Sequence, residues 1–411
     1  MRTAFLFISV LFLSVTCQSE VIQVGKNQRI ATIRQALAQC HPGDTILVLR
    51  GIYKEGNLVV TKPVTLIGKD HPVLDGQLKY EILSIGGSHI TLDGFTLQNS
   101  RFSSSNDYAA ISITNGSDII IKNNKINNAH FGIHVNNSSQ CRIENNDIAG
   151  KAISEQESGN GIHLWKCQGV SIINNHITGH RDGIYFEFVS HSEIRNNLSE
   201  KNIRYGLHFM FSSYDLYYNN TFSNNGTGVA VMYSNHVTMY YNTFKKNWGS
   251  ASYAILLKEI SDSKICYNKF LSNTIALFLE GTSRMLIQRN LFRENGWAVR
   301  IQASCSDNSV LNNNFMSNTF DVSTNGSLVL NTFLNNFWDK YEGYDINKDG
   351  IGDVPYHPVS MYSMIVEENP NSLILLKSFL VSLLDKAEKA IPSLTPENLY
   401  DAKPMMKANP L

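Results

Sequence analysis

The sequence is poor in charged residues and has no excess of either sign. Of its 411 residues only 17% are Asp, Glu, Lys or Arg, and 35 basic residues balance 35 acidic ones. Proteins that bind nucleic acids through a basic surface carry a positive excess, so this class is disfavoured.

Proline and cysteine are scarce as well. The chain has 10 Pro, and 43% of its residues are hydrophobic, which excludes a disordered protein of low hydrophobicity. Its 6 Cys form no CxxC pair and show no zinc-finger spacing. If Cys17 is removed with a leader, an odd number of cysteines remains, and no disulfide framework is predicted: Cys40, Cys141, Cys167, Cys266 and Cys305.

The start of the chain carries an export signal. A basic beginning, Met1-Arg2-Thr3, precedes an apolar run from Ala4 to Val15 that is too short to span a bilayer, so residues 1–19 are predicted to be a secretory signal peptide. Cys17 leaves lipidation open, but cleavage near Ser19 is favoured because no Leu stands three residues before Cys17.

A repeat occupies most of the remaining chain. The phrase apolar-x-x-Asn-x-Ile/Phe recurs about every 22 or 23 residues, and its members are Asn124, Asn146, Asn175, Asn220, Asn242, Asn268, Asn290 and Asn313. The longer gap after Asn146 contains the polar stretch Ser154 to Gly159, which is predicted to be an outward loop. Asn tolerates the left-handed backbone of a corner, and its amide can form a ladder with identical neighbours, so a structural role is predicted.

A second strand in each repeat follows a Gly or Ala. The first and third residues after the small residue are apolar in eight successive repeats, from Gly132 to Gln302. This period of two is typical of strands with one face in a core, and the pattern of an amphipathic helix is missing. We therefore predict an all-β protein, a right-handed parallel β-helix over residues 50–335.

The two ends of the solenoid are predicted to carry caps. Residues 20–49 form the N-terminal cap, with a short helix from Ile30 to Gln39 that presents Ile30, Ile33, Leu37 and Ala38. Residues 336–371 form a C-terminal cap, and residues 372–411 contain an amphipathic helix and a tail. The helix stripe is too short to span a membrane, so it covers the last coil or, as we favour, docks onto a partner through Leu376, Leu380 and Leu384.

The C-terminal cap also contains a loop that is rich in Asp and Asn. Carboxylates and an amide alternate around Gly350, as in loops that wrap oxygen ligands around Ca²⁺. The candidate ligands are Asp345, Asn347, Asp349 and Asp353. The Glu that closes an EF-hand loop is absent, so a plain Asx-rich turn is the equal alternative.

Outward positions of successive coils should form columns on the surface. Imidazole and thioether groups without a carboxylate cage suit copper, and thioethers favour Cu(I). The copper candidates are His208, Met210, Met232, His163 and His134. The alternative is an apolar patch under a partner protein, with the partner-binding candidates Trp165, Glu187, Phe188, Phe211 and Tyr233. His176, His180, His191 and His236 lie near turns in no common register and are interpreted as solvated.

An enzyme that acts on polysaccharides is the alternative function, since parallel β-helices often serve this chemistry. It needs clustered carboxylates as acid and base, and the outward columns contain only Glu187 and Glu280, far apart, with Lys258. A polysaccharide-binding, degrading or epimerising protein is therefore a weaker hypothesis.

Several motifs resemble one known family. The stretches Gly206 to Ser213 and Gly228 to Ser234, together with Asn336 to Asp339 and Asp349 to Asp353, resemble the NosD family of periplasmic maturation proteins of nitrous oxide reductase. The resemblance covers nearly the whole mature chain.

The resemblance implies a periplasmic, non-enzymatic protein associated with the membrane through its partners. The implied partners are an ATP-binding-cassette ATPase and permease of the NosF and NosY type, a copper chaperone lipoprotein of the NosL type, and the reductase itself. The expected cargo is transient copper, as Cu(I), or a sulfur species.

Overall fold

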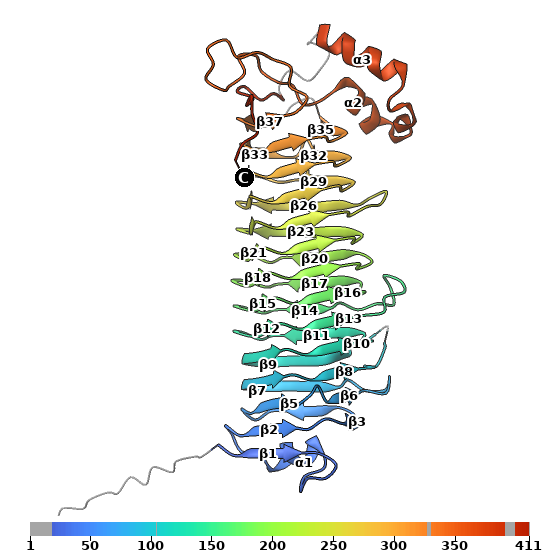
Figure 1. The fold of residues 1–411 in the computed structure, drawn as a ribbon, viewed down its shortest axis with the longest axis vertical. Coiled ribbons are helices and arrows are strands. Elements are labelled where there is room, and N and C mark those ends of the chain that lie inside the picture. Colours follow the sequence, from blue (N-terminus) through green and yellow to red (C-terminus); the bar gives the residue numbers. More distant parts are fainter. Residues whose placement is uncertain (1–18, 104, 327–329, 391–398, 411) are drawn as a thin grey trace, which may run out of the picture.

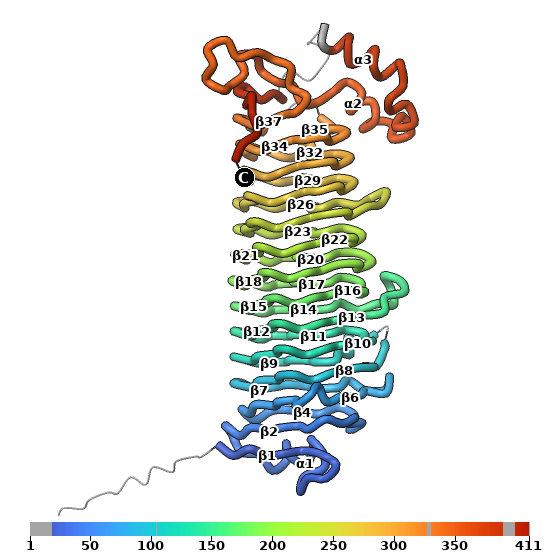
Figure 2. The backbone as a smooth tube through the Cα atoms, in the orientation of Figure 1, coloured from blue at the N-terminus to red at the C-terminus, as the bar shows by residue number. Residues whose placement is uncertain are grey.

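The computed structural model describes residues 19–103, 105–326, 330–390 and 399–410. The predicted signal peptide, with Cys17, lies outside the described residues apart from Ser19. The described chain winds into one tall parallel β-helix (Figures 1 and 2), so the predicted fold is confirmed.

Each full coil contributes a strand to each of three faces, and every strand pairing within the named sheets is parallel. Face 1 consists of β4 (Leu58–Val60), β7 (Leu83–Asp93), β9 (Ala109–Lys122), β11 (Phe131–Asn136), β14 (Ile162–Trp165), β17 (Asp182–Glu187), β20 (Tyr205–Met210), β23 (Thr227–Asn235), β26 (Tyr253–Ser261), β29 (Ile275–Glu280), β32 (Trp297–Ile301) and β35 (Phe320–Thr324).

Strands β7 and β9 continue around a corner into face 2, which joins the first two faces into one sheet. The other strands of face 2 are β1 (Val21–Val24), β2 (Thr45–Val48), β5 (Thr65–Gly68), β12 (Arg142–Glu144), β15 (Ser171–Ile173), β18 (Glu193–Arg195), β21 (Leu216–Tyr218), β24 (Thr238–Tyr240), β27 (Lys264–Cys266), β30 (Leu286–Gln288), β33 (Ser306–Leu311) and β36 (Leu330–Leu334).

Face 3 is a separate sheet. Its strands are β3 (Ile52–Tyr53), β6 (Val73–Asp75), β8 (Thr96–Gln98), β10 (Lys125–Asn127), β13 (Asp147–Ala149), β16 (His176–Thr178), β19 (Leu198–Glu200), β22 (Thr221–Ser223), β25 (Thr243–Lys245), β28 (Lys269–Leu271), β31 (Leu291–Arg293), β34 (Asn314–Met316) and β37 (Phe337–Trp338).

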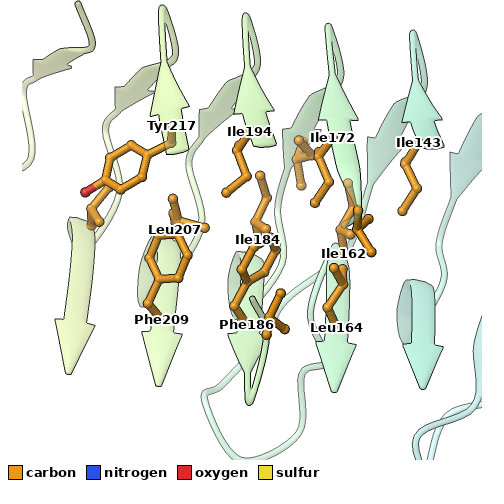
Figure 3. Close-up of a cluster of buried hydrophobic side chains, with 14 of the residues drawn as sticks. Ile143, Ile162, Leu164, Ile172, Ile184, Phe186, Ile194, Leu207, Phe209 and Tyr217 are labelled. Atoms are coloured by element: carbon orange, nitrogen blue, oxygen red, sulfur yellow. The ribbon is translucent and has the colours of Figure 1, made fainter. Parts of the chain in front are cut away.

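The core runs along the inside of the coils. Figure 3 shows side chains of faces 1 and 2 meeting there, among them Ile184, Phe209 and Tyr217, all with no solvent exposure. Face 3 adds a stack of rings with centroids 4.0–5.4 Å apart: Phe222, Phe244, Phe270, Phe292, Phe315 and Trp338. Large side chains repeat at the same height in each coil because the parallel register repeats with the coil.

The predicted Asn ladder occupies the corner between faces 2 and 3. Each Nδ2 donates to the Oδ1 of the Asn in the next coil, at 2.9–3.1 Å, from Asn124 to Asn336. The ladder includes Asn197, which stands outside the repeated phrase because Ser199 takes the place of Ile or Phe. The left-handed backbone belongs to the residue before each ladder Asn, such as Asn145 or Tyr241, so the amide ladder alone explains the repeated Asn.

The N-terminal boundary differs from the prediction. Strand β1 pairs in register with β2, Val21 with Thr45, so the parallel ladder begins well before residue 50. Helix α1 (Ile33–Gln39) begins after its N-cap Thr32 and buries Ile33 and Ala36. Ile30 lies before the helix and Ala38 is exposed, so the predicted apolar face was wrong at these two positions.

The C-terminal region covers the last coil with three short helices: α2 (Met361–Glu368), the 3₁₀ helix η1 (Pro370–Leu375) and α3 (Phe379–Ala390). The helical part of residues 372–411 is not one continuous helix, because Lys377 has a positive φ of 66° and separates η1 from α3. Helix α3 packs through Val381, together with Phe320 of the last coil and Tyr362 of α2. No helix of the described chain is long and apolar enough to cross a bilayer.

The end of the chain returns to the solenoid. Asp401 and Met405 form parallel bridges with Phe333 and Phe337, which adds a partial coil. The buried Asp401 carboxylate accepts hydrogen bonds from the backbone of Asn335, from the backbone and side chain of Asn336 and from the Trp338 indole, at 2.9–3.1 Å. Asp401 therefore terminates the Asn ladder, and this part of the tail packs against the coils rather than extending freely.

Candidate functional site

The predicted outward columns exist on face 1. Strand pairing aligns His134 with His163, then with Tyr185 and His208, and the neighbouring column aligns Trp165, Glu187, Met210 and Met232. Register in a parallel solenoid follows from the repeat, which is why the sequence sufficed to predict the columns.

The first column is a continuous stack of rings. Centroids lie 4.8 Å apart between His134 and His163, 4.6 Å between His163 and Tyr185, and 5.0 Å between Tyr185 and His208. Burial lowers the pKa of His134, and burial, with the neighbouring His134 and Arg181, lowers the pKa of His163 to about 3. These imidazoles are therefore neutral near pH 7.

His208 contacts a neighbouring cationic side chain. It is 3% exposed, and its Nδ1 accepts a hydrogen bond from the Arg204 guanidinium at 3.2 Å, because a guanidinium can only donate. Its Nε2 has no hydrogen-bond partner among the described residues. The predicted copper-ligand role of His208 stays a prediction, and in this structure only Nε2 is left to serve it.

A buried charge cluster explains the position of Arg204. The Asp182 carboxylate, with no solvent exposure, contacts the guanidinium nitrogens of Arg204 at 3.3 Å and Arg181 at 3.6 Å. Arg204 also lies over the ring of Tyr205, 4.5 Å from its centroid. The cluster carries one cation in excess.

The thioethers of Met210 and Met232 remain accessible. Both side chains are half-buried, and the two residues are register partners in neighbouring strands, about 4.8 Å apart along the solenoid. The Tyr185 hydroxyl lies 3.6 Å from the Met210 sulfur and 3.2 Å from Glu187. Two soft sulfur atoms, with a carboxylate nearby, suit a monovalent copper ion.

An exposed aromatic ridge borders the two methionines. Phe188, Phe211 and Tyr233 stack with centroids 5.3 and 5.2 Å apart, and they are 47%, 44% and 44% exposed. Each has a positive φ near 50° at the turn from face 1 to face 2. Trp165 lies in the adjacent column under the Lys166 ammonium, 4.2 Å from its ring centroid.

A second exposed ladder was missed in the sequence. His191, Tyr214 and His236 stack at centroid distances of 5.2 and 4.6 Å, three residues beyond the aromatic ridge on the same turns. The interpretation that His191 and His236 share no register was wrong, and their constant spacing of three residues from the aromatic ridge would have revealed it. His176 is half-exposed and contacts Asp147 and Glu200, whereas His180 is 1% exposed and is not solvated.

The calcium candidates form a turn. Oxygens of Asp345, Asn347, Asp349 and Asp353 accept hydrogen bonds from backbone N–H groups of the same loop. Because these oxygens already accept hydrogen bonds within the loop, the structure favours the Asx-turn interpretation. Across the described ranges, no group of three or more His, Cys, Asp or Glu residues is placed to hold a metal ion.

Carboxylates in the outward columns are isolated. Glu280 forms an ion pair with Lys258 at 3.2 Å, and the Glu187 carboxylate accepts a hydrogen bond from the Tyr185 hydroxyl. Within the described part of the two columns no pair of carboxylates faces a common space, which is the arrangement that acid and base catalysis on sugars requires.

Two family models match this chain. The family model described as "Periplasmic copper-binding protein (NosD)" matches residues 145–350, and a "Right handed beta helix region" matches residues 77–154. Two curated relatives, each named "Probable ABC transporter binding protein NosD", come from Stutzerimonas stutzeri and Pseudomonas aeruginosa. They are 26% and 27% identical over 86% of this chain and 85% and 86% of their own lengths.

Solved structures share the fold at low identity. The catalytic unit of an α-1,3-glucanase from Streptomyces thermodiastaticus has a TM-score of 0.56 at 13% identity, covering 75% of this chain and 62% of its own. The surface adhesin PfbA of Streptococcus pneumoniae has a TM-score of 0.53 at 13% identity, covering 71% of this chain and 86% of its own. Because one is an enzyme and the other an adhesin, the fold alone does not specify function.

Proposed function

Because this chain belongs to the NosD family, we propose that it acts in the periplasm as a non-enzymatic accessory subunit for the copper-site maturation of nitrous oxide reductase. In this role it accepts or hands on copper and works with an ATP-binding-cassette transporter of the NosF and NosY type. A copper chaperone of the NosL type and the reductase are the other proposed partners. Export by the signal peptide places the subunit in the periplasm.

The observation that carries the copper part of the proposal is the half-buried pair Met210 and Met232 beside the aromatic ridge. The described cysteines are weaker candidates, because all five are buried and burial raises the pKa of Cys141 and of Cys266 to about 11. Neutral thiols at these positions are poor metal ligands. Exposed rings around the methionines would contact the protein that delivers or receives copper.

The observation that carries the transporter part is the apolar surface of η1 and α3. Ile374 and Phe379 are 88% and 83% exposed, and Leu380 and Leu383 are about half exposed. The opposite side of α3 already packs against the protein. Val381 packs on α2, and Glu388 accepts a hydrogen bond from Met361 N at 3.0 Å. Relatives are named as transporter-binding proteins, and we propose that this surface docks on the periplasmic side of the permease.

Substituting Leu380 and Leu383 by Glu should abolish co-purification with the permease and ATPase while leaving thermal stability nearly unchanged. Exposed substitutions away from packed features change stability by about 0.5 kcal/mol or less. Pull-down from membranes, with a melting curve of each purified variant, is the measurement.

The matched control is Val381→Ala on the same helix, which removes a buried contact. It should lower the stability of the C-terminal cap and leave the docking surface in place. Undiminished co-purification of the double Glu variant would contradict docking through α3.

A further inference from the structure

Two buried histidines lie outside the columns, in a pocket that is also lined by two loops: the first loop connects β8 to β9, and the second connects β13 to β14. His130 precedes β11 and His180 precedes β17, and they are 7% and 1% exposed. Both line one pocket, together with Phe102 of the first loop and Ser158 and Gly159 of the second.

Each of these rings has an unused nitrogen. His130 Nδ1 and His180 Nε2 are buried and have no hydrogen-bond partner among the described residues. Buried polar atoms are almost always paired, because an unpaired one costs about 1–3 kcal/mol. Here two such nitrogens belong to histidines that line the same pocket.

The hydrogen bonding of His180 suits a metal ligand. Its ring forms a hydrogen bond with the backbone of Gly159, and its Nε2 has no partner in the described chain. The bond to Gly159 is therefore made by Nδ1, which donates to the carbonyl. A ring that donates one N–H to a carbonyl presents the other nitrogen as a lone pair, which is the usual arrangement of a metal-bound histidine.

Neighbouring residues fix the backbone of the two histidines and leave space for the His180 ring. The backbone N–H of His180 donates to Asn202 at 3.1 Å, and that of His130 donates to Ser100 at 2.9 Å. A Cβ on Gly150 would lie 2.8 Å from Nδ1 of His180, so glycine there leaves room for the ring.

We propose that His130 Nδ1 and His180 Nε2 together bind one Cu(I) ion in this pocket. Zn²⁺ prefers four ligands, whereas Cu(I) accepts two neutral imidazoles. Lys151 also lines the pocket, and its charge repels a divalent ion twice as strongly as a monovalent one. The identity of the ion rests on the proposed function, but the site is separate from Met210 and Met232.

The test is an anaerobic Cu(I) titration of the full mature chain against a chromophoric chelator. The variant H130Q/H180Q should bind one Cu(I) fewer than the wild type and keep the methionine site. The variant M210L/M232L should keep the histidine site, and X-ray absorption should show its copper bound by nitrogen alone. This second measurement leaves the histidines intact, so it does not depend on how H130Q/H180Q folds.

The outcomes separate the two sites. Copper bound to M210L/M232L through sulfur, or no copper bound to it, would overturn the histidine site. Equal copper stoichiometry in the wild type and folded H130Q/H180Q would do the same. Copper bound through nitrogen alone in the wild type would count against the proposed methionine site and leave the histidine site standing.

Discussion

Replacing Asp401 by Ala should destabilise the C-terminal end of the solenoid by about 3–6 kcal/mol. The carboxylate accepts four hydrogen bonds from residues of the last coil, and Asp401 itself has no solvent exposure. Alanine would leave the buried backbone N–H of Asn336 and the buried Trp338 indole N–H without a partner, and each such group costs about 1–3 kcal/mol. Chemical denaturation with Trp fluorescence measures the change, because Trp338 is one of the donors.

The control for Asp401 is Asp385→Ala on α3, which removes the same charge from an exposed position. It should change stability by about 0.5 kcal/mol or less. Equal unfolding midpoints for the wild type and Asp401→Ala would show that the tail does not terminate the ladder.

The second large effect concerns acid. His163 has a folded-state pKa of about 3, lowered by burial between its ring neighbours, against an ordinary value of 6.5. In the unfolded chain the His163 ring therefore becomes protonated below pH 6.5. In the folded protein the ring stays neutral until the pH falls to about 3. Stability from this group is complete above pH 6.5 and is lost as the pH falls toward 3.

Between pH 7 and pH 4 the wild type should lose about 2–3 kcal/mol more than His163→Gln. The difference between the two proteins isolates this residue from other titrating groups, such as Asp215, whose pKa burial raises to about 8. Urea unfolding at both pH values provides the measurement. Parallel losses in the two proteins would mean that His163 titrates normally in the folded state.

The repeating parts of this structure were predictable from sequence, whereas the non-repeating parts were not. A fixed period places Met210 beside Met232 and His134 beside His163, since parallel register copies each position into the next coil. The fixed period applies to turn positions as well, so it also predicts the ladder that contains His191 and His236.

The surroundings of His208 depend on residues outside the repeat. Arg204 stands in a turn, and nothing in its spacing says that its guanidinium reaches the His208 ring. The return of Asp401 to the ladder is likewise a long-range contact made once in the chain. The break at Lys377 was hidden because an apolar stripe continues across it.

The central claim is that the outer face of this β-helix holds copper through thioethers, and X-ray absorption of the Cu(I)-loaded chain tests it most directly. Met239 is inward-facing and fully buried, so Met239→Leu is the matched control. We predict sulfur ligands to copper in the wild type and in Met239→Leu, and their disappearance in M210L/M232L. Copper without sulfur ligands in the wild type, or unchanged sulfur ligation in M210L/M232L, would contradict the claim.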